Sequence, residues 1–471
     1  MRCDIDQVTR IDVLPDDVLL GIFDFCVDVS PAYGNKRRIE AWQSLVHVCR
    51  RWRRLVLGSP RGLNLRLCFT PKTPAAARER LDVWPALPLV VAGNMTLSGT
   101  DNIIAALGQS NRVCQVDLSN LRSWKLEEVL AAMQVPFPEL TELRLCSYGE
   151  MLPVIPDTFL DGSAPRLRIF DLYGIPFPGL PKLLLSASHL VELWLNDIPH
   201  SGYISPEAMV TLISVLSSLR LLSLGFRTPL SRPNLETQSL SPPKRSILPA
   251  LHTFHFKGVT EYLEELVSFI DTPQLEDMDI IFSNQIDFDC PRLIQFLNYT
   301  PTLWACDKAH LQFYYSFARV VFPSGPRGLW ITISCREPDW QLSPLEQVCK
   351  SSFPPLSTVQ DLYIEHPYSQ LVFKNDAIEN TPWLPLLLPF TAVKNLYLSK
   401  EFAPGVATAL QELVGSRITE VFASLQNIFV EGLEPSGPFQ ENIGRFVAAR
   451  QLSDSPIVVS DWDKDLSMWP M

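Results

Sequence analysis

Length, composition and charge already exclude several classes of function. The chain has 471 residues, 46% hydrophobic and 19% charged, which is typical of a folded protein and unlike a disordered chain. Its formal net charge of -11 disfavours a general nucleic-acid binder, because such a protein needs a basic surface to displace counterions from phosphate. We therefore expect a protein partner and no nucleic acid.

Prolines and cysteines indicate the architecture and the compartment. The 40 prolines recur along the whole chain, which predicts many short elements separated by turns. The ten cysteines form no C-x-x-C pair, as expected of reduced thiols in a cytoplasmic or nuclear protein. The first residues lack an apolar signal region, and the segment 209–226 contains Arg220 and five serine or threonine residues. We expect neither secretion nor a membrane span.

Residues 11–26, IDVLPDDVLLGIFDFC, predict a first helix that starts at Pro15. Pro15 suits the first helical position, and the two aspartates that follow complement the helix dipole. Leu19, Ile22, Phe23 and Cys26 recur at helical spacing, and a second apolar stripe contains Val18, Ile22 and Phe25. A short helix with two apolar stripes buries one of them in its own fold and has another use for the rest.

A second helical stretch, EAWQSLVHVCRRWRRLV, places apolar residues on one face and four arginines mainly around the other. Together, LPDDVLLGIFDFC and VCRRWRRLV resemble an F-box, in which a Leu-Pro pair opens the first helix and a V-C-R-x-W signature marks the last. The connection between the two halves, VDVSPAYGNKRRIEAW, is longer and more polar than is usual in that family. The alternative is a helical cap on the region that follows.

The resemblance implies a partner. F-box modules dock a Skp-type adaptor that links them to a cullin-RING ubiquitin ligase. Carried over by motif position, the expected adaptor-binding residues are Leu14, Pro15, Val18, Leu19, Ile22, Phe23, Val48, Cys49 and Trp52.

Self-similarity dominates the remaining chain. An apolar-x-x-apolar-x-apolar pattern recurs ten times, as VCQVDL, LTELRL, LRIFDL, LVELWL, LRLLSL, LHTFHF, LEDMDI, VQDLYI, VKNLYL and LQNIFV. The first seven copies start 23 to 32 residues apart, close to the spacing of leucine-rich repeats. Each copy predicts one short strand followed by a helix or loop that packs on its neighbours.

Two irregularities modify this prediction. Regular leucine-rich repeats place an asparagine three residues after the strand, and here that position holds Tyr148, Ile175, Ile198, Arg227 and Val259. In addition, 84 residues separate Leu275 from Val359. Within that gap AHLQFYYSFARVVF and GLWITISC alternate like ordinary strands, so we expect a local antiparallel excursion.

The predicted fold class is α/β: an N-terminal helical F-box followed by an irregular leucine-rich-repeat-like solenoid of short parallel strands and helices. Downstream phrases such as FTAVKNLYLSKEFAPGVATALQEL resemble a large group of F-box proteins from mushroom-forming fungi.

These patterns divide the chain into five parts. We expect an N-terminal tail (1–10), an F-box (11–57), a junction with an atypical capping repeat (58–110), a leucine-rich-repeat-like target-binding domain (111–451) and a C-terminal tail (452–471). Ser205 and Thr260 are the expected caps of two helices in the target-binding domain. The proline-rich segment 227–249 predicts an exposed loop. Thr228 and Ser241 precede prolines there, and we favour plain solvated positions over sites of modification.

No motif indicates catalysis. The sequence has no G-x-S-x-G, P-loop, G-x-G-x-x-G or H-E-x-x-H motif, and His252 and His255 fall on opposite faces of a strand. Glu261, Glu264 and Glu265 are expected on a solvated helix surface. We therefore expect no enzyme activity, no cofactor and no metal.

The leading hypothesis is a target-recruiting subunit of a Skp, cullin and F-box ligase, monomeric within a hetero-complex. The alternative is a repeat-based scaffold or sensor whose N-terminal helices only cap the solenoid. Because solenoids bind partners on their strand-lined face, the expected target-binding positions are Glu142, Arg144, Glu192, Trp194, Arg220 and Ser223.

Overall fold

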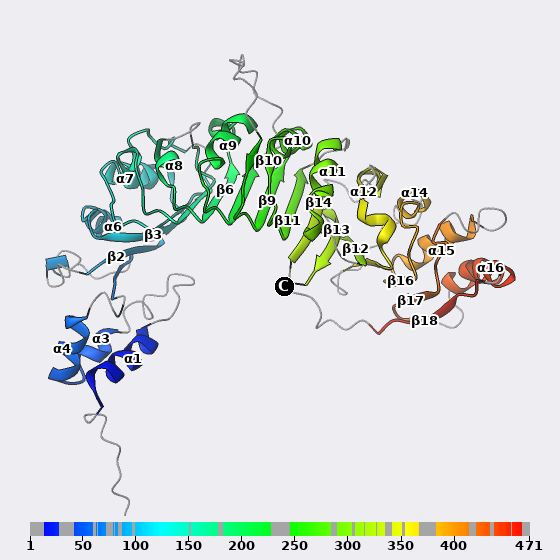
Figure 1. The fold of residues 1–471 in the computed structure, drawn as a ribbon, viewed down its shortest axis with the longest axis horizontal. Coiled ribbons are helices and arrows are strands. Elements are labelled where there is room, and N and C mark those ends of the chain that lie inside the picture. The colour runs from blue at the N-terminus through cyan, green and yellow to red at the C-terminus, as the bar shows by residue number, and fades with distance from the viewer. Residues whose placement is uncertain are drawn as a thin grey trace, which may run out of the picture. The chain divides into compact units, whose positions relative to one another are not determined.

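The secondary structure is mixed α/β, which confirms the predicted class. Among the described residues, 16 of the 18 strands belong to one mostly parallel sheet (Figure 1). The chain divides into two compact units, residues 1–192 and 193–471, which are described in turn. The computed structural model describes residues 14–27, 42–59, 63, 65–71, 79, 81–82, 87–96, 99–149, 152–177, 182–227, 245–283, 290–303, 307–314, 316–325, 327–334, 342–350, 354–366, 383–413, 421–433, 438–453 and 455–463. The predicted N-terminal tail, the connection within the F-box-like segment and most of the proline-rich loop, with Thr228 and Ser241, lie outside these residues.

The first unit contains a helical module, which we define as residues 14–27 and 42–59. It contains α1 (Asp16–Val27), α3 (Trp42–Val46) and α4 (Arg50–Gly58). The first helix starts directly after Pro15, whose carbonyl accepts the Leu19 N–H at 3.0 Å. Pro15 therefore precedes the helix by one residue instead of opening it.

The rest of the first unit alternates strands and helices. Its strands are β1 (Leu67–Phe69), β2 (Leu89–Asn94), β3 (Val113–Ser119), β4 (Glu142–Cys146) and β5 (Ile169–Tyr173), and β6 (Glu192–Ile198) begins at its last residue. Strands β1 to β5 pair in chain order, and every pair is parallel. The helices are α6 (Thr100–Leu107), α7 (Ser123–Ala132) and α8 (Lys182–Ser186), with a 3-10 helix at Phe159–Gly162.

One face of these strands is packed and the other is open. Alternate residues of β4 and β5, such as Leu143 and Phe170, are fully buried toward the helices, while Glu142, Ile169 and their alternate neighbours remain partly exposed. Period-two alternation in the sequence thus produces a strand-lined face that is accessible to solvent.

The second unit continues the alternation. Its strands are β7 (Leu221–Phe226), β8 (Ser246–Ile247), β9 (Thr253–Gly258), β10 (Ile270–Asp271), β11 (Asp277–Ser283), β12 (Lys308–Phe313), β13 (Phe317–Ser324), β14 (Arg327–Ser334), β15 (Asp361–Glu365), β16 (Asn395–Leu398), β17 (Asn427–Val430) and β18 (Val458–Asp461). Its helices are α9 (Pro206–Ile213), α10 (Thr260–Ser268), α11 (Pro291–Asn298), α12 (Leu342–Lys350), α14 (Leu384–Leu387), α15 (Ala403–Gln411) and α16 (Pro438–Leu452), with 3-10 helices at His200–Gly202, Pro301–Leu303 and Pro354–Thr358.

The predicted antiparallel excursion is confirmed. Parallel strands β7, β9, β11 and β14 are followed in the sheet by β13, which is antiparallel to both β14 and β12. Parallel pairing then resumes through β12, β15, β16, β17 and β18, and the short strands β8 and β10 form a separate parallel pair. Strand β18 lies within residues 452–471, which the sequence had indicated as a tail.

All ten recurring segments contain a strand, and nine of those strands begin two residues after the leading apolar residue of the segment. The leading residues, for example Leu190 and Leu275, are fully buried in the turns before their strands. The apolar pattern therefore marks buried residues, and along the chain the buried segment begins before the paired strand does.

One of the two predicted helix caps is wrong. Ser205 caps α9 by accepting the Ala208 N–H at 3.2 Å, as expected. Thr260 is already the first residue of α10, and Val259 occupies the cap position without a side-chain hydrogen bond. The Thr260 side chain is almost completely buried, so it contributes to packing and does not cap the helix.

Side-chain ladders cross the parallel strands at the end of the second unit. On the strand face the rings of His310, Tyr363, Tyr397 and Phe429 stack with successive centroid distances of 4.3, 4.2 and 4.6 Å. Amide hydrogen bonds of 2.7 Å join Asn395 to Asp361 and Asn427 to Asn395. These ladders join neighbouring parallel strands through their side chains.

Candidate functional site

The helical module has a small core of its own. Leu19 and Phe23 of α1 are fully buried, as are Trp42 of α3 and Val56 of α4. The ring of Trp52 packs on that of Phe23, with a centroid distance of 4.7 Å. One apolar stripe of α1 therefore holds the three helices together.

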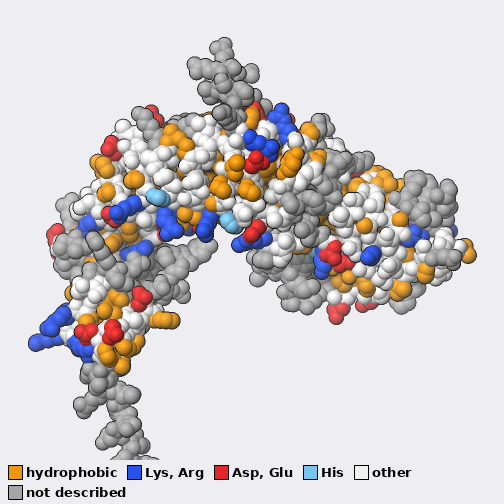
Figure 2. Space-filling view, in the orientation of Figure 1, with side chains coloured by type: hydrophobic (Ala, Val, Ile, Leu, Met, Phe, Trp, Pro, Cys, Tyr) orange, Lys and Arg blue, Asp and Glu red, His pale blue; other side chains and the backbone are white. Residues whose placement is uncertain are grey.

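The other stripe of α1 is exposed. The exposed fractions are 43% for Val18, 45% for Ile22 and 89% for Phe25, and Val48, before α4, is 58% exposed. Hydrophobic side chains are visible on the surface of this module in Figure 2. The module core is filled without these four residues, and among the described residues each of them leaves apolar surface exposed.

Polar contacts fix α4 against the start of α1. The Arg51 guanidinium forms an ion pair of 2.5 Å with Asp16 and donates to the Leu14 carbonyl at 2.6 Å. Arg53 donates to the Val46 carbonyl at 2.9 Å. Two of the four arginines in this segment thus brace the module, a role that the sequence alone did not indicate.

The nine predicted adaptor-binding residues occupy three environments. Those with exposed side chains are Pro15, Val18, Ile22 and Val48; those that are half-buried are Leu14, Cys49 and Trp52; and those in the module core are Leu19 and Phe23. Phe25, the most exposed apolar residue of α1, was not among the nine. Its place in the second apolar stripe was the signal that could have included it.

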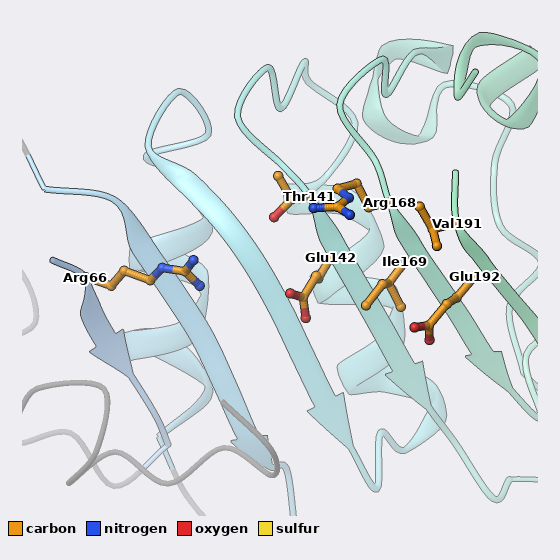
Figure 3. Close-up of a pocket in the computed structure, with 7 residues that line it drawn as sticks. All are labelled: Arg66, Thr141, Glu142, Arg168, Ile169, Val191 and Glu192. Carbon is orange, nitrogen blue, oxygen red and sulfur yellow. The ribbon is translucent and has the colours of Figure 1, made fainter. Parts of the chain in front are cut away.

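A second candidate site is a pocket of about 340 Å³ on the first unit, at the start of β4, β5 and β6 (Figure 3). Its lining residues are Arg66, Thr141, Glu142, Arg168, Ile169, Val191 and Glu192. Figure 3 shows the side chains of Glu142, Ile169 and Glu192 projecting from neighbouring strands to the same side of the sheet. The pocket therefore combines charges of both signs with an aliphatic floor.

A row of charged residues crosses the strand face next to the pocket. In the strand register Arg144 of β4 lies between Asp117 of β3 and Asp171 of β5. Burial raises the pKa of Asp117 and raises that of Asp171 to about 6, in each case against the attraction of Arg144. The charges of Asp117 and Glu192 raise the pKa of Asp171 further. The strand face is thus acidic and partly desolvated here.

The six predicted target-binding residues are not equivalent. Glu142 and Glu192 line the pocket and Arg144 lies in the row beside it. In the second unit, the Trp194 ring packs edge-on against that of His255 at 5.7 Å, and Arg220 is exposed in the turn before β7. Ser223 is only 4% exposed and donates to the Asn196 side chain at 2.9 Å. Ser223 is therefore a poor contact position. Sequence reasoning missed Arg66, Arg168 and Ile169 of the pocket.

The described residues contain no group of three or more histidine, cysteine, aspartate or glutamate side chains placed to hold a metal ion. In the described part of the chain, no helix is both long and apolar enough to cross a membrane. No protein-family model matches this sequence, and no curated protein matches it either.

Proposed function

We propose that the protein is a non-catalytic, target-recruiting subunit of a Skp, cullin and F-box ubiquitin ligase in the cytoplasm or nucleus. In this proposal the helical module is an F-box that docks the Skp-type adaptor. The strands and helices that follow form an irregular leucine-rich-repeat-like solenoid that binds a target protein. Holding the target near the ubiquitin carrier raises its effective concentration, so binding itself is the mechanism.

The observation that carries the proposal is the exposed apolar surface of Val18, Ile22, Phe25 and Val48 on a module whose core is already filled. Apolar side chains at the centre of an interface supply most of its binding energy. The F-box-like motif assigns three of these four residues to the adaptor interface. Structure and motif therefore favour the same face of the module.

One observation favours the alternative, a scaffold or sensor whose helices cap the solenoid. The buried Trp42 indole donates from Nε1 to the Arg66 carbonyl at 2.9 Å, which fixes α3 to the segment that enters β1. A cap requires this contact, whereas a docking module also tolerates it. The free face of α1 has no function in a cap, so we favour the docking function.

The test is affinity capture of the full chain followed by mass spectrometry. The variant Val18→Asp with Ile22→Asp places charge on the exposed stripe and leaves the Trp42 contact intact, which deletion of the module would not. We expect loss of the Skp-type adaptor and cullin with retention of other partners. Leu452→Asp, at a 90% exposed position of α16, is the matched control and should capture everything. Absence of adaptor and cullin from the wild-type capture would refute the proposal and favour the scaffold.

A further inference from the structure

The pocket on the first unit has a composition that points to a ligand class. Glu142 and Glu192 contribute negative charge, Arg66 and Arg168 positive charge, and Ile169 and Val191 aliphatic surface. A pocket that receives a ligand leaves at least some of these charges available.

Two of the charged groups are available. Within the described part of the chain, neither the Arg168 guanidinium nor the Glu142 carboxylate makes a hydrogen bond or an ion pair. Nearby charges behave differently, since Arg166 pairs with Glu139 and Arg112 donates to the Leu87 carbonyl. One positive and one negative side chain that line the pocket, Arg168 and Glu142, are therefore available to a ligand.

The strand register places the negative charges of the pocket in one row, apart from the positive charges. Glu142 lies beside Ile169 in the pairing of β4 with β5. Glu192 is the first residue of β6, and its N–H donates to the Arg168 carbonyl at 2.9 Å, which places it on the other side of Ile169. Neighbouring strands are about 4.8 Å apart, so the backbones of the two glutamates are about 10 Å apart with Ile169 between them. That spacing accommodates the aliphatic stem of a lysine or arginine, with its charged head between the carboxylates. In Figure 3, Arg168 and Arg66 lie away from this row of side chains.

We propose that this pocket receives a short segment of the target in which a basic and an acidic side chain are close together. The basic side chain lies over Ile169, with its charge between Glu142 and Glu192, and the acidic side chain meets Arg168 and Arg66. This inference rests on the proposed function, since it assigns the target chemistry of the strand face. The carboxylates and the net charge of -11 disfavour a polyphosphate or nucleic acid as ligand.

The test uses four capped, fluorescein-labelled pentapeptides and the full chain. The first carries lysine and glutamate two residues apart, which places both on one face of an extended peptide. In the others glutamine replaces the lysine, the glutamate or both. By fluorescence anisotropy at low salt, we expect each lost charge to weaken binding about twofold to fivefold, and salt to abolish the difference. Equal binding of the four peptides would overturn the proposal.

A charge-reversed variant keeps the test decisive. Glu142→Lys with Glu192→Lys should lose its preference for the lysine peptide and bind a peptide with two glutamates more tightly than wild type does. A gain of this kind cannot arise from misfolding, and unchanged peptide preference would contradict the assignment. Adaptor binding is measured on the same samples. Selective peptide binding without adaptor binding would refute only the ligase proposal, whereas adaptor binding without selectivity would refute only the pocket assignment.

Discussion

Truncation of the exposed stripe of α1 tests the docking surface most directly. The double substitution Ile22→Ala with Phe25→Ala removes the two most exposed apolar side chains of α1, whose exposed fractions are 45% and 89%. Alanine is the best helix former, so α1 itself should be retained. The stability of the protein should change by less than about 0.5 kcal/mol, as is usual for exposed positions.

The expected loss of affinity follows from the exposed fractions. Full burial of a side chain of this size contributes about 1.5 to 3 kcal/mol. Phe25 still exposes 89% and Ile22 45% of its surface, so the two together could contribute about 2 to 4 kcal/mol on docking. Alanine retains the Cβ carbon, and an interface rarely buries a side chain completely, so the lower end of this energy range is expected. A loss of 2 kcal/mol weakens adaptor affinity about thirtyfold.

Isothermal titration of a Skp-type adaptor into wild type and variant, with thermal unfolding in parallel, measures both quantities. Leu452→Ala, which removes an equally exposed side chain from α16, should leave adaptor affinity unchanged. Phe23→Ala should instead destabilise the module by about 3 kcal/mol or more, because Phe23 is fully buried against Trp52. Unchanged adaptor affinity of the Ile22 and Phe25 variant would refute the docking face.

Three further predictions concern stability, each measured by thermal or denaturant unfolding. Glu264 accepts two backbone N–H groups at the start of α11, at 2.9 and 2.7 Å, so Glu264→Ala should cost about 1 to 2 kcal/mol, while Glu261→Ala on the exposed surface of α10 should cost almost nothing. The pKa of Asp171 is raised from 3.8 to about 6 in the folded protein, so ionisation of this carboxyl destabilises the fold increasingly as the pH rises between these values. Asp171→Asn should therefore stabilise the protein above pH 6, by at most about 3 kcal/mol, and have no such effect below pH 4. Equal gains at pH 4 and 7.5 would contradict this. Arg450 is fully buried and donates to three carbonyls, so Arg450→Met should cost about 3 kcal/mol, and the exposed Arg445→Met provides the control.

The strands could be predicted from the sequence because period-two alternation is a local property. The excursion at β12, β13 and β14 followed from the same alternation, without the repeat pattern. The starting points of the strands could not be predicted, because a leading residue such as Leu190 is buried in the turn before its strand. Burial and strand pairing leave the same apolar signal in a sequence.

The candidate sites depended on contacts that sequence does not reveal. Glu264 was expected to be solvated, yet it caps a helix that begins 27 residues later. Ser223 has the alternation of an outward residue, but it is covered on the strand face and bonded to Asn196. Trp52 matches the docking motif but also packs on Phe23, so motif and core share that residue. The two stripes of α1 were visible in the sequence, and only the structure distinguished the buried stripe from the free one.

The antiparallel strands β12, β13 and β14 have a consequence for folding kinetics. Their two turns close within a few residues, and each strand pairs with its chain neighbour over four to eight residue pairs. Parallel strands elsewhere pair only after a longer connection has formed, which costs more loop entropy before any contact stabilises it. Residues 308–334 can therefore form a three-stranded nucleus early. Strands β11 and β15 would then add to its two edges, so that parallel pairing propagates in both directions from a single starting point.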